Sequence, residues 1–251
     1  MGGSDSAGTP WEGRHFDHNS FSADDGSAPE RLIEALRRFR AREVGEVDVV
    51  DAFRESRLLI PLVARLGESD AGDHGHVVDK SAELSIVTVA GPDGRNVMPV
   101  FSSVEAMQRW NPKARPVPAD AVRVALAAAS DDTELVVLDA TSATEFVIRR
   151  PALWAIARSR PWTPSYLDDE VLREFVEAAH PESAVSAVML DTGDADARLA
   201  GPELIVRLAL APGLAQPELD ALLARLQHRW SASPVITARV DSMRVQLTAA
   251  S

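Results

Sequence analysis

The clearest pattern of apolar and polar positions begins with a short apolar run at residues 96–101, which passes directly into a helical periodicity. The run has the length and composition of a buried strand. Pro99 cannot donate a backbone hydrogen bond, so its presence favours an edge position or a bulge nearby. Ser102 and Glu105 have the spacing of a capping box, which predicts that a helix begins directly after Ser102.

Val104, Met107 and Trp110 share one face of this predicted helix, because they recur at intervals of three residues. Apolar stripes of this kind usually pack into a core. Trp110 also stands at the helix end beside the proline-rich segment 112–118, so an exposed docking surface is the alternative interpretation.

A second helix is predicted near the N-terminus, where Ser27 and Glu30 again have the capping-box spacing. Its apolar face carries Leu32, Ile33, Leu36 and Phe39. Its opposite face is rich in arginine, with Arg31, Arg37, Arg38, Arg40 and Arg42. That basic face is either an ordinary solvated surface or a binding surface for an acidic partner. A shorter helix is expected at residues 48–53.

The pattern up to residue 161 predicts a mixture of short strands and helices. The expected elements are a strand at 58–66 broken by Pro61, a hairpin at 83–101, an extended link at 112–118, a helix at 119–129 with Val122 and Leu126 inward, strands at 135–138 and 145–148, and a helix that starts at Pro151 and carries Leu153, Trp154 and Ile156.

Residues 161–165 form a proline-rich break that predicts a domain boundary. Beyond it, we expect a helix with Val171, Leu172, Phe175 and Val176 on one face, a buried strand at 184–190, a half-buried strand at 204–210, a helix from Pro217, and strands at 234–239 and 243–247. This order predicts a small antiparallel sheet with helices on one face.

The predicted fold class is therefore α+β. We expect a mobile polar tail at residues 1–26, an N-terminal domain built on a mixed α/β sheet at 27–161, and a smaller α+β C-terminal domain at 166–251.

A series of short motifs runs through the first two thirds of the chain: Asp79-Lys80-Ser81-Ala82-Glu83, Gly91-Pro92-Asp93-Gly94-Arg95, Met98-Pro99-Val100-Phe101-Ser102-Ser103, Trp110-Asn111-Pro112, Arg115-Pro116-Val117-Pro118, Val147-Ile148-Arg149-Arg150-Pro151-Ala152-Leu153-Trp154 and Arg160-Pro161-Trp162. Together they resemble the SseB family, named after a bacterial protein linked to enhanced serine sensitivity, and most closely its actinobacterial members. The resemblance covers residues 11–165 well and the rest loosely. It implies a family fold, but no defined biochemical activity.

The chain has 251 residues, a formal net charge of −12 and no cysteine. The missing cysteines exclude disulfides, thiolate catalysis and cysteine-bound zinc. The acidic charge disfavours nucleic acids and anionic lipids as partners. No apolar run is long enough to span a bilayer, and the N-terminus lacks a signal-peptide pattern. We therefore expect a cytoplasmic protein without membrane association.

Metal and catalytic chemistry find little support in the sequence. The polar segment 67–80 carries the possible ligands Asp70, Asp73, His74, His76 and Asp79, but their spacing fits no metal motif, and a solvated loop is the preferred interpretation. The chain has no glycine-rich phosphate loop, dinucleotide fingerprint or nucleophile elbow. We assign no catalytic residue, metal ligand or cofactor.

Basic and aromatic residues interleave in one place, around Trp154 and Trp162, with Arg149, Arg150, Arg158 and Arg160. Such a patch could stack and neutralise nucleic acid. It could equally consist of arginine stems that cover tryptophans at a domain junction, and the acidic charge of the chain favours this second interpretation. The candidate partner-binding residues are Trp110, Arg149, Arg150 and Trp154.

The leading hypothesis is a non-enzymatic protein-interaction or regulatory module with an unidentified protein partner. A small-molecule- or metal-responsive regulator that uses the 67–80 segment or the domain crevice is the alternative. An enzyme without a recognisable motif ranks third.

Overall fold

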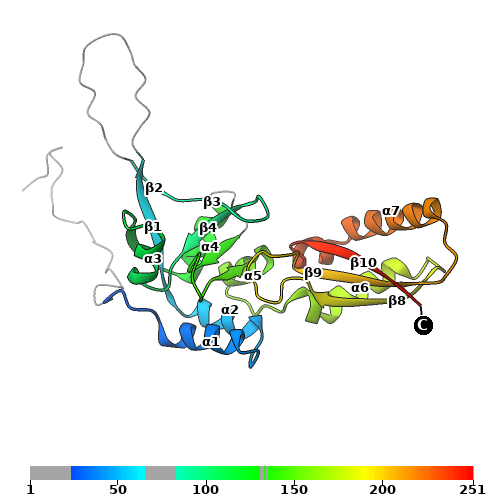
Figure 1. Ribbon diagram of the computed structural model, residues 1–251, viewed down its shortest axis with the longest axis horizontal. Helices are drawn as coiled ribbons and strands as arrows, with labels where there is room; N and C mark the ends of the chain where they lie inside the picture. The colour runs from blue at the N-terminus through cyan, green and yellow to red at the C-terminus, as the bar shows by residue number, and fades with distance from the viewer. Residues whose placement is uncertain (1–23, 66–82, 131–132, 134, 251) are drawn as a thin grey trace, which may run out of the picture.

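The structure, a computed structural model, describes residues 24–65, 83–130, 133 and 135–250. These residues form eight α-helices and ten strands in three sheets, so the α+β class is as predicted. The elements up to α5 lie at one end of an elongated molecule, and those from α6 to β10 lie at the other (Figure 1). Residues 1–23 of the predicted tail and the whole 67–80 segment fall outside the described residues.

The first part of the chain combines two sheets with flanking helices. The β2-β1-β5 sheet is antiparallel, and the β3-β4-β6-β7 sheet is mixed, with β4 and β6 parallel. A bridge between Leu59 and Phe101 joins the two sheets. The elements are α1 (Glu30–Arg40), α2 (Glu46–Arg54), β1 (Arg57–Arg65), β2 (Glu83–Ile86), β3 (Val89–Ala90), β4 (Asn96–Val100), α3 (Val104–Trp110), β5 (Arg115–Asp120), α4 (Ala121–Ser130), β6 (Val136–Leu138), β7 (Phe146–Ile148) and α5 (Arg150–Ala157).

Two predictions about prolines and strands were wrong in this part. β1 continues through Pro61, and the proline-rich link forms most of its partner strand β5, in which Pro116 lies opposite Pro61. The missing backbone donors of both prolines thus fall at one position of the ladder. The hairpin expected at 83–101 forms only in part, because β3 pairs with β4 whereas β2 pairs with β1 of the other sheet.

The caps of two helices differ from the predicted capping boxes. The N-cap of α3 is Ser103, whose side chain accepts a hydrogen bond from the amide of Ala106. Ser102 is buried instead and donates its hydroxyl to the carboxylate of Asp139 at 2.7 Å. The N-cap of α1 is Pro29, without a side-chain hydrogen bond.

The buried face of a helix is the one that the apolar periodicity predicts where the side chains of the helix differ in size. On α1, the buried residues Leu32, Leu36 and Phe39 are among those predicted. On α4 the prediction was wrong: Leu126 is 53% exposed, and the buried side chains are Ala121, Val124, Ala125 and Ala128. An alanine-rich helix can bury several different faces, because its small side chains give little contrast between them.

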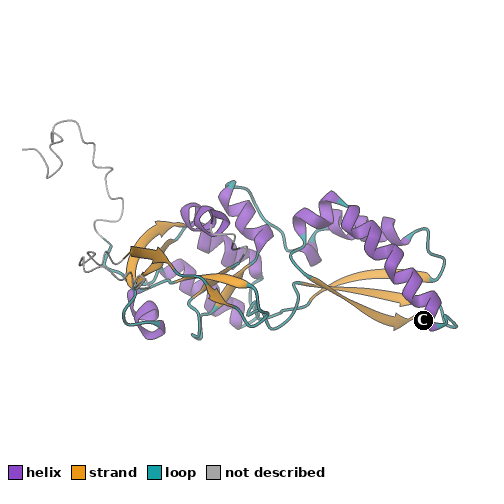
Figure 2. Ribbon diagram, turned by 90° about the horizontal axis from the view of Figure 1, so that it is seen from above, coloured by secondary structure: helices purple, strands orange, loops and turns teal. Residues whose placement is uncertain are grey.

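The second part of the chain forms one sheet with helices on a single face (Figure 2). Its order is β10-β9-β8, with β8 and β9 antiparallel but β9 and β10 parallel, so the antiparallel prediction was wrong for β10. The predicted strand at 234–239 is a helix, which Ser233 caps and Pro234 begins. The elements are a 3-10 turn (Ser165–Leu167), α6 (Asp169–Ala179), β8 (Val185–Thr192), β9 (Leu204–Leu210), α7 (Gln216–Ala232), α8 (Pro234–Arg239) and β10 (Met243–Ala249).

The core of this part lies between the helices and the sheet. Val171 and Phe175 of α6 are buried as predicted, whereas Val176 is 44% exposed. β8 is an edge strand with half-buried and exposed side chains, not the buried strand that the apolar run indicated. The central strand β9 takes that role, and its buried Leu204, Val206 and Leu208 face α6 and α7.

The loop between β8 and β9 returns to the first part of the chain. Ala197 is buried in the same core as α1 and β7, and its carbonyl accepts a hydrogen bond from Val147 at 2.8 Å. Leu199 is buried against Val97 and Val137. Residues beyond 190 therefore complete the core of the first part, and the predicted division at 161–165 stays a prediction.

Candidate binding groove between α5 and α8

A groove of about 430 Å³ lies between α5, the link that follows it, and α8. Its lining residues come from segments far apart in the sequence and combine aromatic, proline and arginine side chains. They are Pro151, Trp154, Ala155, Arg158, Arg160, Pro161, Trp162, Thr163, Asp168, Ala238 and Arg239.

Trp154 is the largest exposed side chain of the groove, with 37% of its surface accessible. Two guanidinium groups contact its ring: that of Arg150 lies 4.8 Å from the ring centroid, and that of Arg158 lies 5.6 Å from it. Both distances are within the range of a cation–π interaction. The ring is therefore flanked by two cations while part of it remains accessible to a ligand.

Arg150 also fixes the width of the groove. Its Nη2 atom donates to the carbonyl of Thr237 at 3.0 Å and to that of Val240 at 2.6 Å, at the C-terminal end of α8. These carbonyls carry partial negative charge, which favours a cation there. One arginine thus ties α5 to α8 and holds the tryptophan ring in place.

Arg149, the N-cap residue of α5, is buried with only 5% of its surface exposed. Its guanidinium pairs with Asp194 at 2.6 Å and with Asp241 at 3.1 Å, and it donates to the carbonyl of Gly201. Arg95 shares the Asp241 carboxylate at 3.0 Å. This buried cluster joins α5 to the β8–β9 loop and to the turn before β10.

Two further carboxylates lie near this cluster. Glu203 accepts hydrogen bonds from the hydroxyl of Ser165 and from the amide of Asp241, and Glu46 accepts one from the hydroxyl of Tyr166. Burial raises the pKa of Glu46 to about 7, and it also raises the pKa of Glu203. The hydroxyl of Tyr166 has a raised pKa for the same reason, with a smaller contribution from the neighbouring Glu46 charge.

Residues 32–155 match the family model described as SseB protein N-terminal domain. This match supports the SseB resemblance of the sequence motifs. The matched SseB segment runs from α1 into α5, so one wall of the groove lies inside it and the α8 wall lies outside it. Neither the curated proteins nor the solved structures contain a match.

The four predicted site residues lie in three different places. Trp154 lines the groove, Arg150 contacts its ring and reaches α8 without lining the groove itself, and Arg149 lies among carboxylates. Trp110, also in the SseB segment, is half-buried at the end of α3 with its ring centroid 5.2 Å from that of Phe101. It belongs to a small core that shares no residue with the groove lining.

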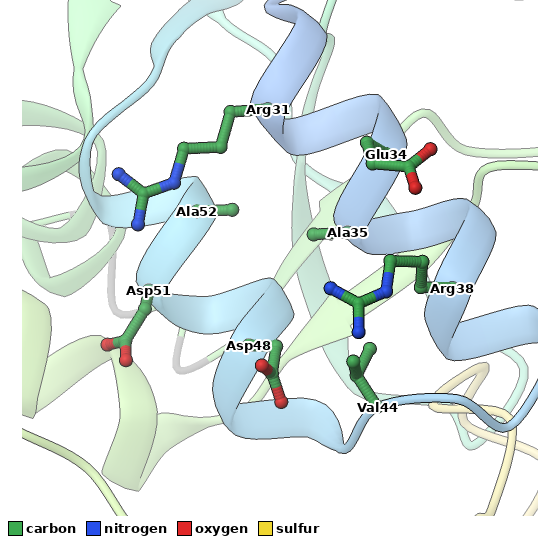
Figure 3. A pocket seen from close by; sticks show the side chains of 8 residues that line it. All are labelled: Arg31, Glu34, Ala35, Arg38, Val44, Asp48, Asp51 and Ala52. Atoms are coloured by element: carbon green, nitrogen blue, oxygen red, sulfur yellow. The ribbon is translucent and has the colours of Figure 1, made fainter.

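A second groove in the SseB segment, of about 270 Å³, lies between α1 and α2. Figure 3 shows Arg31 and Arg38 on α1, and Asp48 and Asp51 on α2, on opposite sides of it. Because charges of both signs line this groove, it offers no strong preference for an anionic or cationic ligand.

The arginine-rich face of α1 finds its acidic partners within the chain. Arg31 pairs with Glu55, Arg37 with Glu34, and Arg38 with Glu43. Arg40 and Arg42 both reach Asp196 of the β8–β9 loop, with the Arg42 pair at 2.6 Å. These arginines thus help to hold the loop against the first part of the chain.

Within the described residues, no cluster of three potential metal-ligating side chains occurs, and the histidines of the 67–80 segment fall outside these residues. In the same residues, no helix combines the length and the apolar character needed to cross a bilayer.

Sequence reasoning missed the carboxylates that surround Arg149. Asp194, Glu203 and Asp241 lie in a loop or directly before strands, and nothing in their local spacing marks them as buried. The weak indication was Arg149 itself, which directly follows the buried strand residue Ile148 and precedes a helix with proline in its first turn.

Proposed function

We propose that this chain is a cytoplasmic, non-enzymatic protein-interaction module of the SseB type, which binds a segment of a partner protein in the groove between α5 and α8. The observation that carries the proposal is the exposed ring of Trp154 between two guanidinium groups. Tryptophan and arginine are the residue types that most often dominate the binding energy of protein interfaces.

The side chains beside the groove are also preorganised for binding. Arg150 is already held by two backbone carbonyls, so it loses little conformational freedom when a partner docks beside it. Arg149 acts in this proposal as a positioning residue, since its buried ion pairs fix the start of α5.

The charge of the lining indicates the chemistry of the partner. Arg158 and Arg160 form no ion pair with any described residue, whereas Arg239 pairs with Asp168 at 2.9 Å. A segment that carries acidic side chains next to an aromatic or apolar side chain would match the two unpaired cations and the tryptophan ring.

The lining gives no support to acid–base catalysis. Its single carboxylate, Asp168, is engaged by Arg239 and by the backbone amides at the start of α6. Among the described lining residues no histidine, lysine, serine or cysteine occurs; the one hydroxyl is that of Thr163, and the one carboxylate that could serve as its base is the engaged Asp168.

Affinity capture with matched variants tests the proposal. The wild type, Trp154→Ala and Arg158→Glu would be compared with Leu126→Ala and Arg123→Glu, which change exposed side chains of α4. We expect one protein to be retained by the wild type and both α4 variants and reduced at least tenfold by both groove variants, with unchanged melting temperatures. Equal retention by the groove variants would contradict the proposal.

A small-molecule-responsive regulator is the second candidate, because a hollow of about 610 Å³ lies between residues 92–95, 199–202 and 241–244. Asp93 and Asp241 line it too, but both pair with Arg95. Arg244 forms no ion pair with any described residue, so a small anionic molecule is the matching ligand class. A thermal-shift screen of carboxylates and phosphates tests this candidate, and an unchanged melting temperature throughout the screen would remove it.

A further inference from the structure

The two edges of the β10-β9-β8 sheet differ in how they are protected. β8 carries a register shift between Val185 and Ala187, and a bulge of this kind twists an edge away from further pairing. β10 pairs with β9 in one unbroken parallel register over its seven residues. Among the described residues no strand pairs with its other side.

Hydrogen bonds show which groups of β10 point outward. The carbonyl of Ser242 accepts from Leu204, and the amide of Ala250 donates to Leu210, so even-numbered residues of β10 face β9. Backbone groups alternate along a strand, and the amides and carbonyls of Met243, Val245, Leu247 and Ala249 therefore point to the open edge.

The side chains of these same residues lie on the helix-covered face. Val245 packs against the core of the second part, and Met243 and Leu247 share its alternation. Met243 is 37% exposed and Leu247 is 40% exposed, so this edge has accessible apolar surface next to its unpaired backbone groups. The strand lacks the lysine, proline or bulge that protects an isolated edge.

We propose that β10 pairs antiparallel with β10 of a second copy of this chain, so that two sheets join into one of six strands. With Gln246 opposite itself on the two-fold axis, Met243 pairs with Ala249 and Val245 pairs with Leu247. All four outward-facing residues then exchange backbone hydrogen bonds, as closely spaced antiparallel pairs do.

In this register the side chains of the two β10 strands match one another, as their backbone hydrogen-bonding groups do. The helix-side pairs are all apolar, so Leu247 becomes covered by Val245 of the other copy. On the opposite face Arg244 lies across from Thr248, and no two like charges meet. A surface that matches itself about a two-fold axis is the requirement for an isologous dimer.

Sedimentation velocity over a range of protein concentrations tests the pairing. We expect a dimer for the wild type, a dimer for Met189→Lys on the opposite edge strand, and a monomer for Leu247→Lys. Met189 is a matched control, because it is 43% exposed against 40% for Leu247. A monomeric wild type at the highest concentration, or a Leu247→Lys dimer, would overturn the proposal.

Single cysteines test the register independently of any loss of folding by the lysine variant, because the chain has no cysteine of its own. Gln246→Cys places two thiols on the axis, in a pair with Cα atoms about 4.5 Å apart, and should form a covalent dimer on mild oxidation. Thr248→Cys would place its thiols on Cα atoms about 14 Å apart, beyond the reach of a disulfide. Equal crosslinking of both variants, or none with Gln246→Cys, would overturn the pairing.

Discussion

Replacing Arg149 by methionine should be among the most damaging single changes in this chain. Methionine keeps much of the length and apolar contact of the side chain but removes its charge. It would leave Asp194, which is 3% exposed, with a buried carboxylate and no cation. Asp241 would keep Arg95 as a partner at 3.0 Å.

The magnitude follows from these contacts. Removing one partner of a buried ion pair costs about 3–5 kcal/mol, because the remaining charge stays desolvated. We expect the lower end, about 3 kcal/mol, because Asp194 still accepts a hydrogen bond from the amide of Leu199. The matched control is Arg207→Met, whose pair with Asp191 is at the same 2.6 Å but has side chains 36% and 44% exposed. An exposed pair contributes about 0–1 kcal/mol.

The assay is urea denaturation followed by circular dichroism, with the free energy of unfolding taken by linear extrapolation. Asp194→Asn, added to Arg149→Met, should recover part of the loss, because it removes the unpaired charge. The reasoning fails if Arg149→Met costs no more than Arg207→Met, or if Asp194→Asn makes the single variant worse.

Four further predictions concern the pH dependence of stability, a helix cap, a buried hydroxyl and a helix face. Burial raises the pKa of Glu46 to about 7, so the folded protein binds the proton of this carboxyl more tightly than the unfolded chain does. The stability that protonated Glu46 contributes is complete below pH 4.5 and is lost as the pH rises through 7. Glu46→Gln should therefore flatten that part of the profile of melting temperature against pH. Ser103→Ala should cost about 1 kcal/mol in urea denaturation by removing the cap of α3. Ser102→Ala should cost at least as much, because it removes a donor from a buried carboxylate. Leu126→Gln should change the free energy of unfolding by less than about 0.5 kcal/mol, whereas Val124→Ala should cost about 2 kcal/mol.

The apolar periodicity of the sequence predicted those helices and strands in which large apolar side chains recur at the spacing of the element. The apolar face of α1 and the strands β6 and β7 are examples, since each depends on residues close together in the sequence. The helix α8 was missed because its Val235 and Ile236 favour a strand locally, while Ser233 and Pro234 supply the start of a helix.

The candidate groove could be predicted only in part. The interleaved arginines and tryptophans pointed to Trp154 and Arg150, because those residues are near one another in the sequence. The α8 wall and the carboxylates around Arg149 come from segments roughly 45 to 90 residues further along, and local patterns carry no information on such contacts.

The return of the β8–β9 loop restricts how the molecule can bend. Ala197 and Leu199 have positive φ angles of 49° and 57°, which cost about 1–2 kcal/mol each and are held by burial in the first part of the chain. Any hinge motion at residues 161–165 would have to withdraw both side chains from that core. The buried loop therefore opposes any change in the width of the α5–α8 groove, so binding in this groove as proposed would not require a domain closure.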